Sequence, residues 1–188
     1  MNSTSVFSMH TQQSEFSIRP AEREDIPSIA IVAQKSFVDA FAHATDPDEL
    51  AHEIKENRSE KYFEGIYGKD TILVALVNEE IIGYIQFGRV DHHYVESTDK
   101  DIDFKRLYIL TKFHSQGIGS ALIDAMFANE RVKNASKVFV NVWDINTKAI
   151  RLYGKYGFIK TGKQYPYFFN GKEVGHDEIL VKNLGGQE

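Results

Sequence analysis

The segment at residues 107–122, LYILTKFHSQGIGSAL, constrains the fold most, because an apolar strand runs through a short polar loop into an amphipathic helix. Gly117 and Gly119 stand where the helix begins, and the absence of a Cβ there lets a bulky ligand approach the backbone closely. The first turn of the helix would present unpaired N–H groups and the positive end of its dipole. A pyrophosphate fits such a site. A tight strand-to-helix turn that binds nothing has the same pattern, so both interpretations stay open at this point.

Two common nucleotide motifs are incomplete in this segment. Gly119 is followed by Ser120 instead of the Lys-Ser/Thr pair of a nucleoside-triphosphate loop. A dinucleotide fingerprint needs a third glycine, and Leu122 occupies that position. We therefore expect any phosphate carrier bound here to be neither ATP nor NAD.

The composition is that of one soluble globular domain. The 188 residues are 42% hydrophobic and 26% charged, and no apolar run approaches the roughly 20 residues that a membrane span needs. The chain has no cysteine, which excludes a disulfide framework, a thiolate zinc site and an acyl-cysteine intermediate. The net charge of -5 argues against a nucleic-acid binder, which would carry a basic stripe. Residues 1–14 are polar and lack the features of a secretory signal, so we expect a disordered leader, a domain over residues 15–188 and a cytoplasmic location.

The remaining patterns alternate between strand and helix. Strands are predicted at residues 16–20, 71–77, 81–87, 104–110 and 137–143, followed by a final pair joined by a turn at Asn170-Gly171. Helices are predicted at residues 24–41 and 46–54, from residue 59, and at residues 117–129 and 146–156. This order predicts one α/β domain, in which an early antiparallel hairpin gives way to a strand–helix–strand unit.

A second motif lies at residues 146–158, NTKAIRLYGKYGF. By itself it is compatible with a helix capped by Asn146, with Tyr153 in the core and Gly157 as the stop. Together with residues 107–122, however, it resembles the GNAT N-acetyltransferase superfamily. The family pattern Asn-x-x-Ala-x-x-x-Tyr-x-x-x-Gly-Phe is complete here, and the pattern Gln/Arg-x-x-Gly-x-Gly/Ala lies at residues 114–119.

The resemblance covers about residues 16–184 and implies a single GNAT-like α/β (α+β) domain. Its mixed central sheet of about seven strands would be flanked by helices, with an antiparallel N-terminal half and a β-α-β core that binds acetyl-CoA. Four segments resemble the bacterial spermidine/spermine acetyltransferase branch, namely residues 37–41, 46–50, 142–146 and 165–171. The chain departs from the family at His114, where Gln or Arg is usual, and at Ser115, where Gly is frequent.

Acetyl-CoA is the co-substrate that the resemblance implies, without a metal. Leu107, Tyr108 and Ile109 would offer their backbone to the pantetheine arm where a bulge splays two strands apart, and one of these amides would hold the oxyanion. Asn146 would reach the pantetheine arm. The pyrophosphate would lie on the loop and first helical turn, made by His114, Ser115, Gln116, Gly117, Ile118, Gly119 and Ser120.

The resemblance also implies catalytic roles. Tyr153 matches the general acid, a phenol beside the departing CoA sulfur. Asp103 lies where some relatives carry a basic glutamate, which makes it the candidate base for an amine that is almost fully protonated at neutral pH. Asn141 stands where other relatives carry a base and cannot serve as one. The competing interpretations are a core aromatic for Tyr153 and a solvated strand-end charge for Asp103.

An acidic connection precedes the fourth strand and offers a clue to the acceptor. It forms either a rim that attracts small cations or an ordinary acidic loop. Its members are Asp91, Glu96, Asp99, Asp101 and Asp103. The neighbouring His92-His93 pair predicts no metal site, because adjacent residues on a strand face opposite sides.

The sequence therefore predicts an enzyme that moves acetyl from acetyl-CoA to a primary amine of a small, polyamine-like cation by direct attack in a ternary complex. A peptide or protein N-acetyltransferase and a non-catalytic acyl-CoA-binding sensor are the alternatives. The expected partner is a small-molecule amine, with no nucleic acid and no membrane, and a homodimer is among the oligomeric states left open.

Overall fold

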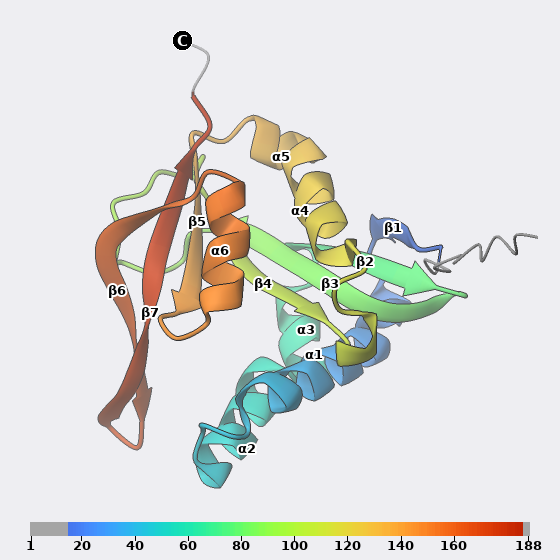
Figure 1. The fold of residues 1–188 in the computed structure, drawn as a ribbon, viewed down its shortest axis with the longest axis horizontal. Helices are drawn as coiled ribbons and strands as arrows, with labels where there is room; N and C mark the ends of the chain where they lie inside the picture. Colours follow the sequence, from blue (N-terminus) through green and yellow to red (C-terminus); the bar gives the residue numbers. More distant parts are fainter. Residues whose placement is uncertain (1–14, 186–188) are drawn as a thin grey trace, which may run out of the picture.

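Seven strands form one mixed sheet in the computed structural model, which describes residues 15–185 (Figure 1). The strand order is β1-β2-β3-β4-β5-β7-β6, and only the neighbours β4 and β5 run parallel. The strands are β1 (Ser17–Pro20), β2 (Thr71–Val77), β3 (Glu80–Arg89), β4 (Ile102–Ile109), β5 (Lys137–Trp143), β6 (Ile159–Phe169) and β7 (Lys172–Asn183). This architecture confirms the predicted mixed sheet with an antiparallel N-terminal half. The leader predicted at residues 1–14 lies outside the described residues.

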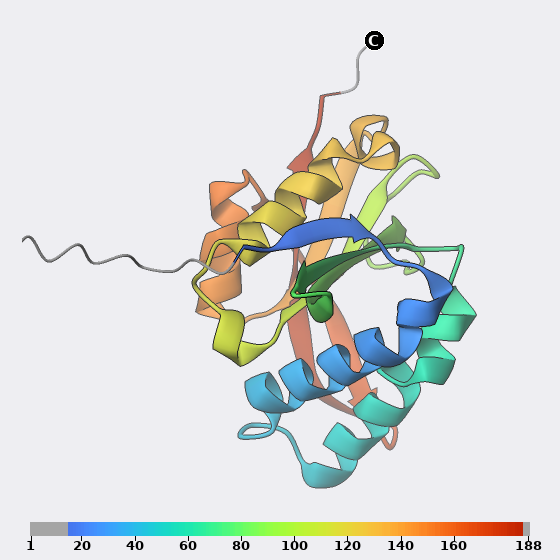
Figure 2. The ribbon, with the colours of Figure 1, turned by 90° about the vertical axis from the view of Figure 1, so that its right-hand side faces the viewer.

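Helices cover both faces of the sheet (Figure 2). On one face α1 and α3 pack on the antiparallel strands through a cluster that includes Ile29, Phe63 and Tyr84. On the other face α4 and α6 bury Leu122, Met126 and Tyr153 against β3, β4 and β5. The helices are α1 (Ile26–Phe41), α2 (Pro47–Asn57), α3 (Glu60–Ile66), α4 (Ile118–Ala128), α5 (Glu130–Lys133) and α6 (Thr147–Lys155). None of those in residues 15–185 combines the length and the apolar character needed to cross a membrane.

Local sequence signals place most element boundaries. Strands β2 and β5 have the predicted bounds, and positive φ angles at Asn170 and Gly171 (50° and 75°) confirm the predicted turn between β6 and β7. The helix predicted from residue 24 opens instead with the 3-10 turn η1 (Arg23–Asp25). Helix α5 was missed, because Asn129 adopts an extended backbone that ends α4 and its side chain then caps the next helix.

A bulge and a short pairing create the opening in the sheet. Gln86 pairs with Arg106 but the next residue of β3 pairs with Phe104, so Lys105 is the extra residue in β4. The parallel pairing of β4 with β5 stops at Phe104 and Val140. The two strands therefore separate from Lys105 onward, beside a bulge in the middle of β4, as the resemblance implied.

Candidate active site

The separated part of β4 leaves two residues with free backbone groups. The N–H of Leu110 donates to the carbonyl of Ile82 at 2.9 Å, which fixes the alternation of the β3–β4 ladder. In an antiparallel ladder every second residue pairs with its opposite neighbour, so Tyr108 is engaged with β3 while Leu107 and Ile109 point toward the gap. Of the three residues predicted to meet the pantetheine arm, Leu107 and Ile109 are the ones that the backbone direction favours.

The predicted phosphate loop ends in a helix N-terminus beside this gap. Ser115 and Gly117 both have positive φ (63° and 83°), and Gly117 is the N-cap of α4. The N–H groups of Ile118, Gly119 and Ser120 follow, and the first turn of a helix offers them no internal acceptor. A Cβ added at Gly119 would lie 3.3 Å from Cδ1 of Ile109, so the helix packs closely on β4. The backbone of residues 117–120 therefore suits an anion.

Three predicted cofactor residues are already engaged through their side chains. Nε2 of His114 lies 2.8 Å from the carbonyl oxygen of Ile109, so its ring folds back onto β4 and occupies one of the two free backbone positions. The amide nitrogen of Gln116 donates to the carbonyl of Lys112 at 3.3 Å. The side-chain oxygen of Asn146 caps α6 by accepting from the N–H of Ala149 at 3.1 Å. Only the NH2 group of Asn146 is left to contact a ligand.

Tyr153 lies at the junction between the core and a large cleft. Its ring packs edge-on against Phe104, with 5.4 Å between ring centroids, and it also contacts Phe158. It nevertheless lines the cleft. Burial raises the pKa of the Tyr153 phenol, and the charges of Tyr108 and Asp177 raise it further. Tyr153 is therefore a core aromatic that also lines the cleft, with a hydroxyl that is neutral at neutral pH.

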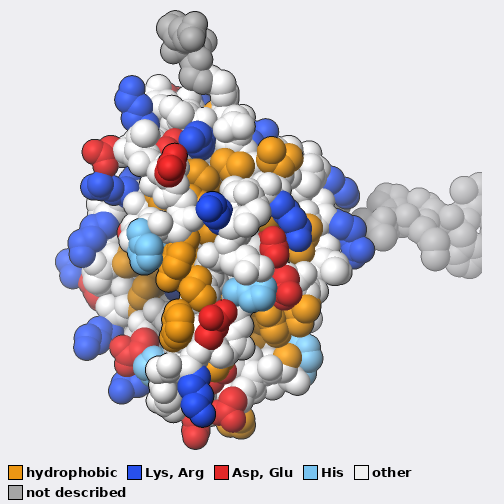
Figure 3. Space-filling view, turned by 90° about the vertical axis from the view of Figure 1, so that its left-hand side faces the viewer, with side chains coloured by type: hydrophobic (Ala, Val, Ile, Leu, Met, Phe, Trp, Pro, Cys, Tyr) orange, Lys and Arg blue, Asp and Glu red, His pale blue; other side chains and the backbone are white. Residues whose placement is uncertain are grey.

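The cleft measures about 540 Å³ and runs between the helices α1 and α2, the ends of β4 and β5, and the β6–β7 hairpin. Figure 3 views the molecule from the side of the hairpin and shows a band of hydrophobic side chains with acidic and histidine side chains next to it. Aromatic residues supply much of the lining. They include Phe37, Phe41, Tyr62, Trp143, Tyr165, Tyr167, Phe168 and Phe169.

Asp103 forms part of the cleft lining and is not a solvated strand-end charge. It is 5% exposed, and its Oδ1 has no hydrogen-bond partner among the described residues. Burial raises the pKa of Asp103 to about 7, an effect that Lys105 opposes and Asp91 reinforces. Oδ1 of Asn141 on β5 is likewise buried without a partner and lines the same cleft. The lining of the cleft therefore includes two buried side-chain oxygen atoms that accept no hydrogen bond from the described residues.

The rest of the acidic connection does not form a rim of free charges. Asp91 pairs with Lys105 at 2.8 Å, and Asp99 pairs with Arg89. Asp101 is buried and accepts from the backbone and hydroxyl of Thr98, which fixes the turn before β4. Of the five residues, only Asp91 and Asp103 line the cleft. The ordinary acidic loop is the better description of the other three.

The predicted reason for excluding a metal at the histidine pair was wrong. His92 and His93 lie in the loop between β3 and β4 and not on a strand, so alternation does not separate them. Their rings instead pack on aromatic neighbours, His92 on Tyr165 at 5.3 Å and His93 on Tyr94 at 4.4 Å between centroids. Within residues 15–185, no three His, Asp or Glu side chains gather as metal ligands.

Comparisons with known proteins agree with this geometry. Residues 68–160, which span β2 to the start of β6, match the family model for an acetyltransferase (GNAT) domain. Together with the fold, this match supports a GNAT acetyltransferase domain. An N-acetyltransferase of Mycobacterium tuberculosis, itself described as uncharacterized, is 29% identical over 163 residues, 85% of this chain and 98% of its own length. These similarities support an acetyl-CoA-dependent acetyltransferase enzyme.

Two other relatives match about half of the chain, and their names differ. The N-alpha-acetyltransferase of Sulfurisphaera tokodaii is 31% identical over 106 residues, 54% of this chain and 64% of its own length. The spermine/spermidine N(1)-acetyltransferase of Bacillus subtilis is 22% identical over 106 residues, 56% and 64% of the two chains. PaiA N-acetyltransferase from Thermoplasma acidophilum, solved in complex with coenzyme A, shares the fold with a TM-score of 0.70 at 18% identity, covering 90% of this chain and 99% of its own.

Sequence reasoning missed several residues of the acceptor side. Arg58 is 7% exposed, stacks 3.4 Å from the ring centroid of Phe37 and pairs with Glu53 at 2.8 Å. Asp177 is 6% exposed and accepts a hydrogen bond from the hydroxyl of Tyr167. No local motif marks these residues. The only signal available was alternation along β7, which puts Asp177 on the face of the buried Ile179.

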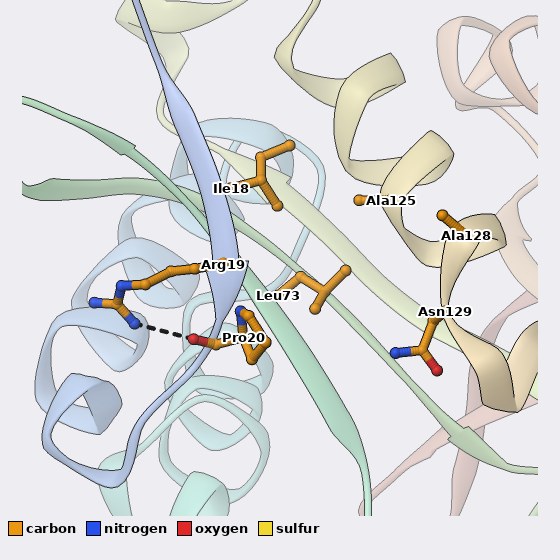
Figure 4. Close-up of a pocket in the computed structure, with 7 residues that line it drawn as sticks. All are labelled: Ile18, Arg19, Pro20, Leu73, Ala125, Ala128 and Asn129. Carbon is orange, nitrogen blue, oxygen red and sulfur yellow. Dashed lines mark hydrogen bonds between the residues drawn. The ribbon is translucent and has the colours of Figure 1, made fainter.

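A second hollow between β1 and α4 shows how different the cleft is (Figure 4). It measures about 290 Å³, and its lining is mostly apolar, with Ile18, Leu73 and Ala125. Its one charged side chain, Arg19, is held by Asp25 at 2.6 Å. It gathers no groups for acetyl transfer, so the cleft is the candidate active site of the acetyltransferase.

Proposed function

We propose that the enzyme acetylates a primary amine of a small, polyamine-like cation by direct attack on acetyl-CoA in a ternary complex. The proposal rests mainly on carboxylates that line the cleft and have no cationic partner. Glu49, Asp103 and Asp177 all line the cleft, and in residues 15–185 none forms a salt bridge with Lys or Arg. The lining also holds Arg58, Lys105 and Arg106, but its carboxylates outnumber them five to three, with Glu49, Glu53, Asp91, Asp103 and Asp177. A cleft with this excess of negative charge attracts ammonium groups.

The cofactor half of the site is supplied by the main chain. We assign the pyrophosphate to residues 115–120 and the pantetheine arm to the backbone of Leu107 and Ile109, with the NH2 group of Asn146 close by. The His114 ring would have to leave the carbonyl of Ile109 for the arm to pair there. Tyr108 contributes its side chain to the acceptor wall and not its backbone. His114 stays outside the phosphate site in this assignment, because its ring is bound to Ile109.

Two side chains carry the proton transfers in this proposal. Freeing an amine with pKa about 10.4 at neutral pH costs about 4 to 5 kcal/mol. Asp103, with a pKa of about 7 that results chiefly from burial, takes that proton directly or through a water. As the new C–N bond forms and the C–S bond breaks, the phenol of Tyr153 donates its proton to the departing sulfur. The N–H of Leu107, which points into the gap, holds the oxyanion.

The second candidate function is acetylation of peptide or protein N-termini. The 31% identity to an N-alpha-acetyltransferase favours it, as does the open rim of the cleft, where Phe168 and Val174 are 62% and 45% exposed. An extended peptide would lie along the β6–β7 hairpin. A neutral peptide carries no second cation, so it would leave the buried carboxylate of Asp177 without a charged partner.

One assay separates the two functions. The protein is incubated with acetyl-CoA and, separately, with spermidine, spermine, free lysine and short peptides, while thiol release is followed. Turnover with the polyamines supports the proposal. Turnover confined to the peptides replaces it with the second function, and an absence of turnover with every amine contradicts both.

A further inference from the structure

Asp177 offers the cleft a second buried carboxylate, separate from that of Asp103. The hydroxyl of Tyr167 donates to its Oδ2, while its Oδ1 is buried and has no hydrogen-bond partner in the described residues. A single general base explains one carboxylate in an acetyltransferase cleft. The second needs another explanation.

Asp177 has no cationic partner among the described residues. Burial raises its pKa to about 6, the hydrogen bond from Tyr167 and the charge of His176 lower it, and Asp144 raises it, so the group is ionised above neutral pH. Within residues 15–185, no lysine or arginine pairs with it. A buried carboxylate with an unsatisfied oxygen costs free energy until a cation or donor completes it.

The sheet register sets the two carboxylates well apart. Asp103 lies opposite Phe139 on β5, and Asp177 lies opposite Trp143 on the same strand. Four residues along β5 and two interstrand spacings correspond to roughly 16 Å between the two Cα atoms. Asp103 and Asp177 line the same cleft, together with Tyr165. At this separation the two carboxylates cannot bind the same ammonium group.

Aromatic side chains line the cleft around both carboxylates. Tyr165 pairs with Asp177 across the β6–β7 ladder, and its ring lies 5.8 Å from that of Tyr167. Phe169 and Trp143 line the same cleft. Such rings pack against methylene groups and attract cations at their faces. The lining thus suits a flexible hydrocarbon chain that carries positive charges.

We propose that the cleft binds an acceptor with two ammonium groups on one chain, the first at Asp103 and the second at Asp177 and Tyr167. The assignment of the reacting amine to Asp103 rests on the proposed function, whereas the second site rests on the contacts of Asp177.

A matched pair of ligands tests this site. 1,8-Diaminooctane and 8-amino-1-octanol have the same chain, but the second carries a hydroxyl in place of one ammonium. Calorimetry with the CoA-bound protein at a pH of about 8 should show the diamine binding tighter by about tenfold or more, which is about 1.4 kcal/mol. Asp177→Asn should remove that preference and lower kcat/KM for the diamine by about tenfold while leaving the amino alcohol within about twofold.

Two variants serve as checks on this result. Asp144→Asn makes the same charge change beside Asp177 but outside the cleft lining, and it should keep the preference. Tyr167→Phe leaves the carboxylate in place and should lower the preference by a smaller factor, which provides a second variant should Asp177→Asn fail to fold by circular dichroism.

Equal affinities of the wild-type protein for the two ligands would overturn the inference. An equal loss of kcat/KM for both in Asp177→Asn would also overturn it, because Asp177 would then act on the reacting amine. The binding preference requires no turnover. A protein that prefers the diamine but transfers no acetyl therefore contradicts the proposed function and leaves the second ammonium site standing.

Discussion

The two halves of the proposed site differ in the groups that form them. The proposed cofactor half consists of main-chain groups from residues 107–120, a single stretch that runs from β4 into α4 beside the cleft. The acceptor half consists of side chains from α1, α2, β4, β5 and the β6–β7 hairpin, which are distant in the sequence. Backbone donors depend on conformation, so many sequences can supply them. Side-chain acceptors depend on identity and on the register of the sheet, so a single substitution changes what the acceptor half binds.

Tyr153→Phe should show the largest effect, because Tyr153 lies where the two halves meet. Loss of the proton donor should lower the rate of acetyl transfer by about 10² or more, with CoA affinity unchanged. Thiol release and CoA calorimetry measure the two quantities. Tyr67→Phe, at an exposed tyrosine on the surface, is the matched control. A rate that stays at the wild-type level would mean that Tyr153 acts only in the core.

Asp103→Asn should lower the rate by about 10² and remove a dependence of kcat/KM on a group with a pKa of about 7. Asp99→Asn, whose side chain is 83% exposed in the same connection, should change neither. Preservation of the pH profile in Asp103→Asn would assign the proton acceptor to another group.

The same variant should alter stability in a pH-dependent way. The pKa of Asp103 is about 7 in the folded protein against an ordinary 3.8, so the folded state binds the proton more tightly. Ionisation of this carboxyl group therefore lowers the free energy of unfolding. The loss is absent below about pH 4, grows between about pH 4 and pH 7, and stays constant above that at up to about 4 kcal/mol. Denaturant unfolding should find Asp103→Asn more stable than wild type at a pH of about 8. A gain that is as large at a pH of about 4 would contradict this account.

Gly117→Ala tests the cofactor half alone. A Cβ at φ 83° is strained, and we expect a loss of about 1 kcal/mol in stability and about tenfold in CoA affinity as the loop shifts. Gly68→Ala places the same strain at φ 78° far from the cleft and should cost stability but not CoA affinity. If the two variants bind CoA equally well, the loop does not hold the pyrophosphate.

His114→Ala should have the smallest effect, and it should strengthen CoA binding instead of weakening it. The ring now occupies the carbonyl of Ile109, and a hydrogen bond contributes about 1 kcal/mol net. Its removal should tighten CoA binding by about twofold to fivefold in calorimetry, whereas His43→Ala, at an exposed site, should leave it unchanged. A tenfold weakening would instead place His114 at the phosphates.

The cofactor half was predictable because its signals are local. Gly117 and Asn146 are positions where conformation or capping dictates the residue, and the structure places both at the predicted helix starts. The direction of the Leu107, Tyr108 and Ile109 backbone was not predictable, because it depends on the bulge at Lys105 and on the register with β3. The contact of the His114 ring with the carbonyl of Ile109 was not predictable either, since nothing local indicates it.

The sequence by itself determined the strand–loop–helix unit, because periodicity and caps act over a few residues. Its two short motifs carried the resemblance that implied the mixed sheet and the class of reaction. The tertiary structure alone decided which acidic groups meet. It paired Asp91 and Asp99 with cations, turned Asp101 into a structural acceptor, and left Asp103 and Asp177 buried and incomplete in one cleft. Burial and pairing arise from contacts between segments far apart in the chain, and a carboxylate becomes a binding group only when those contacts leave it without a partner.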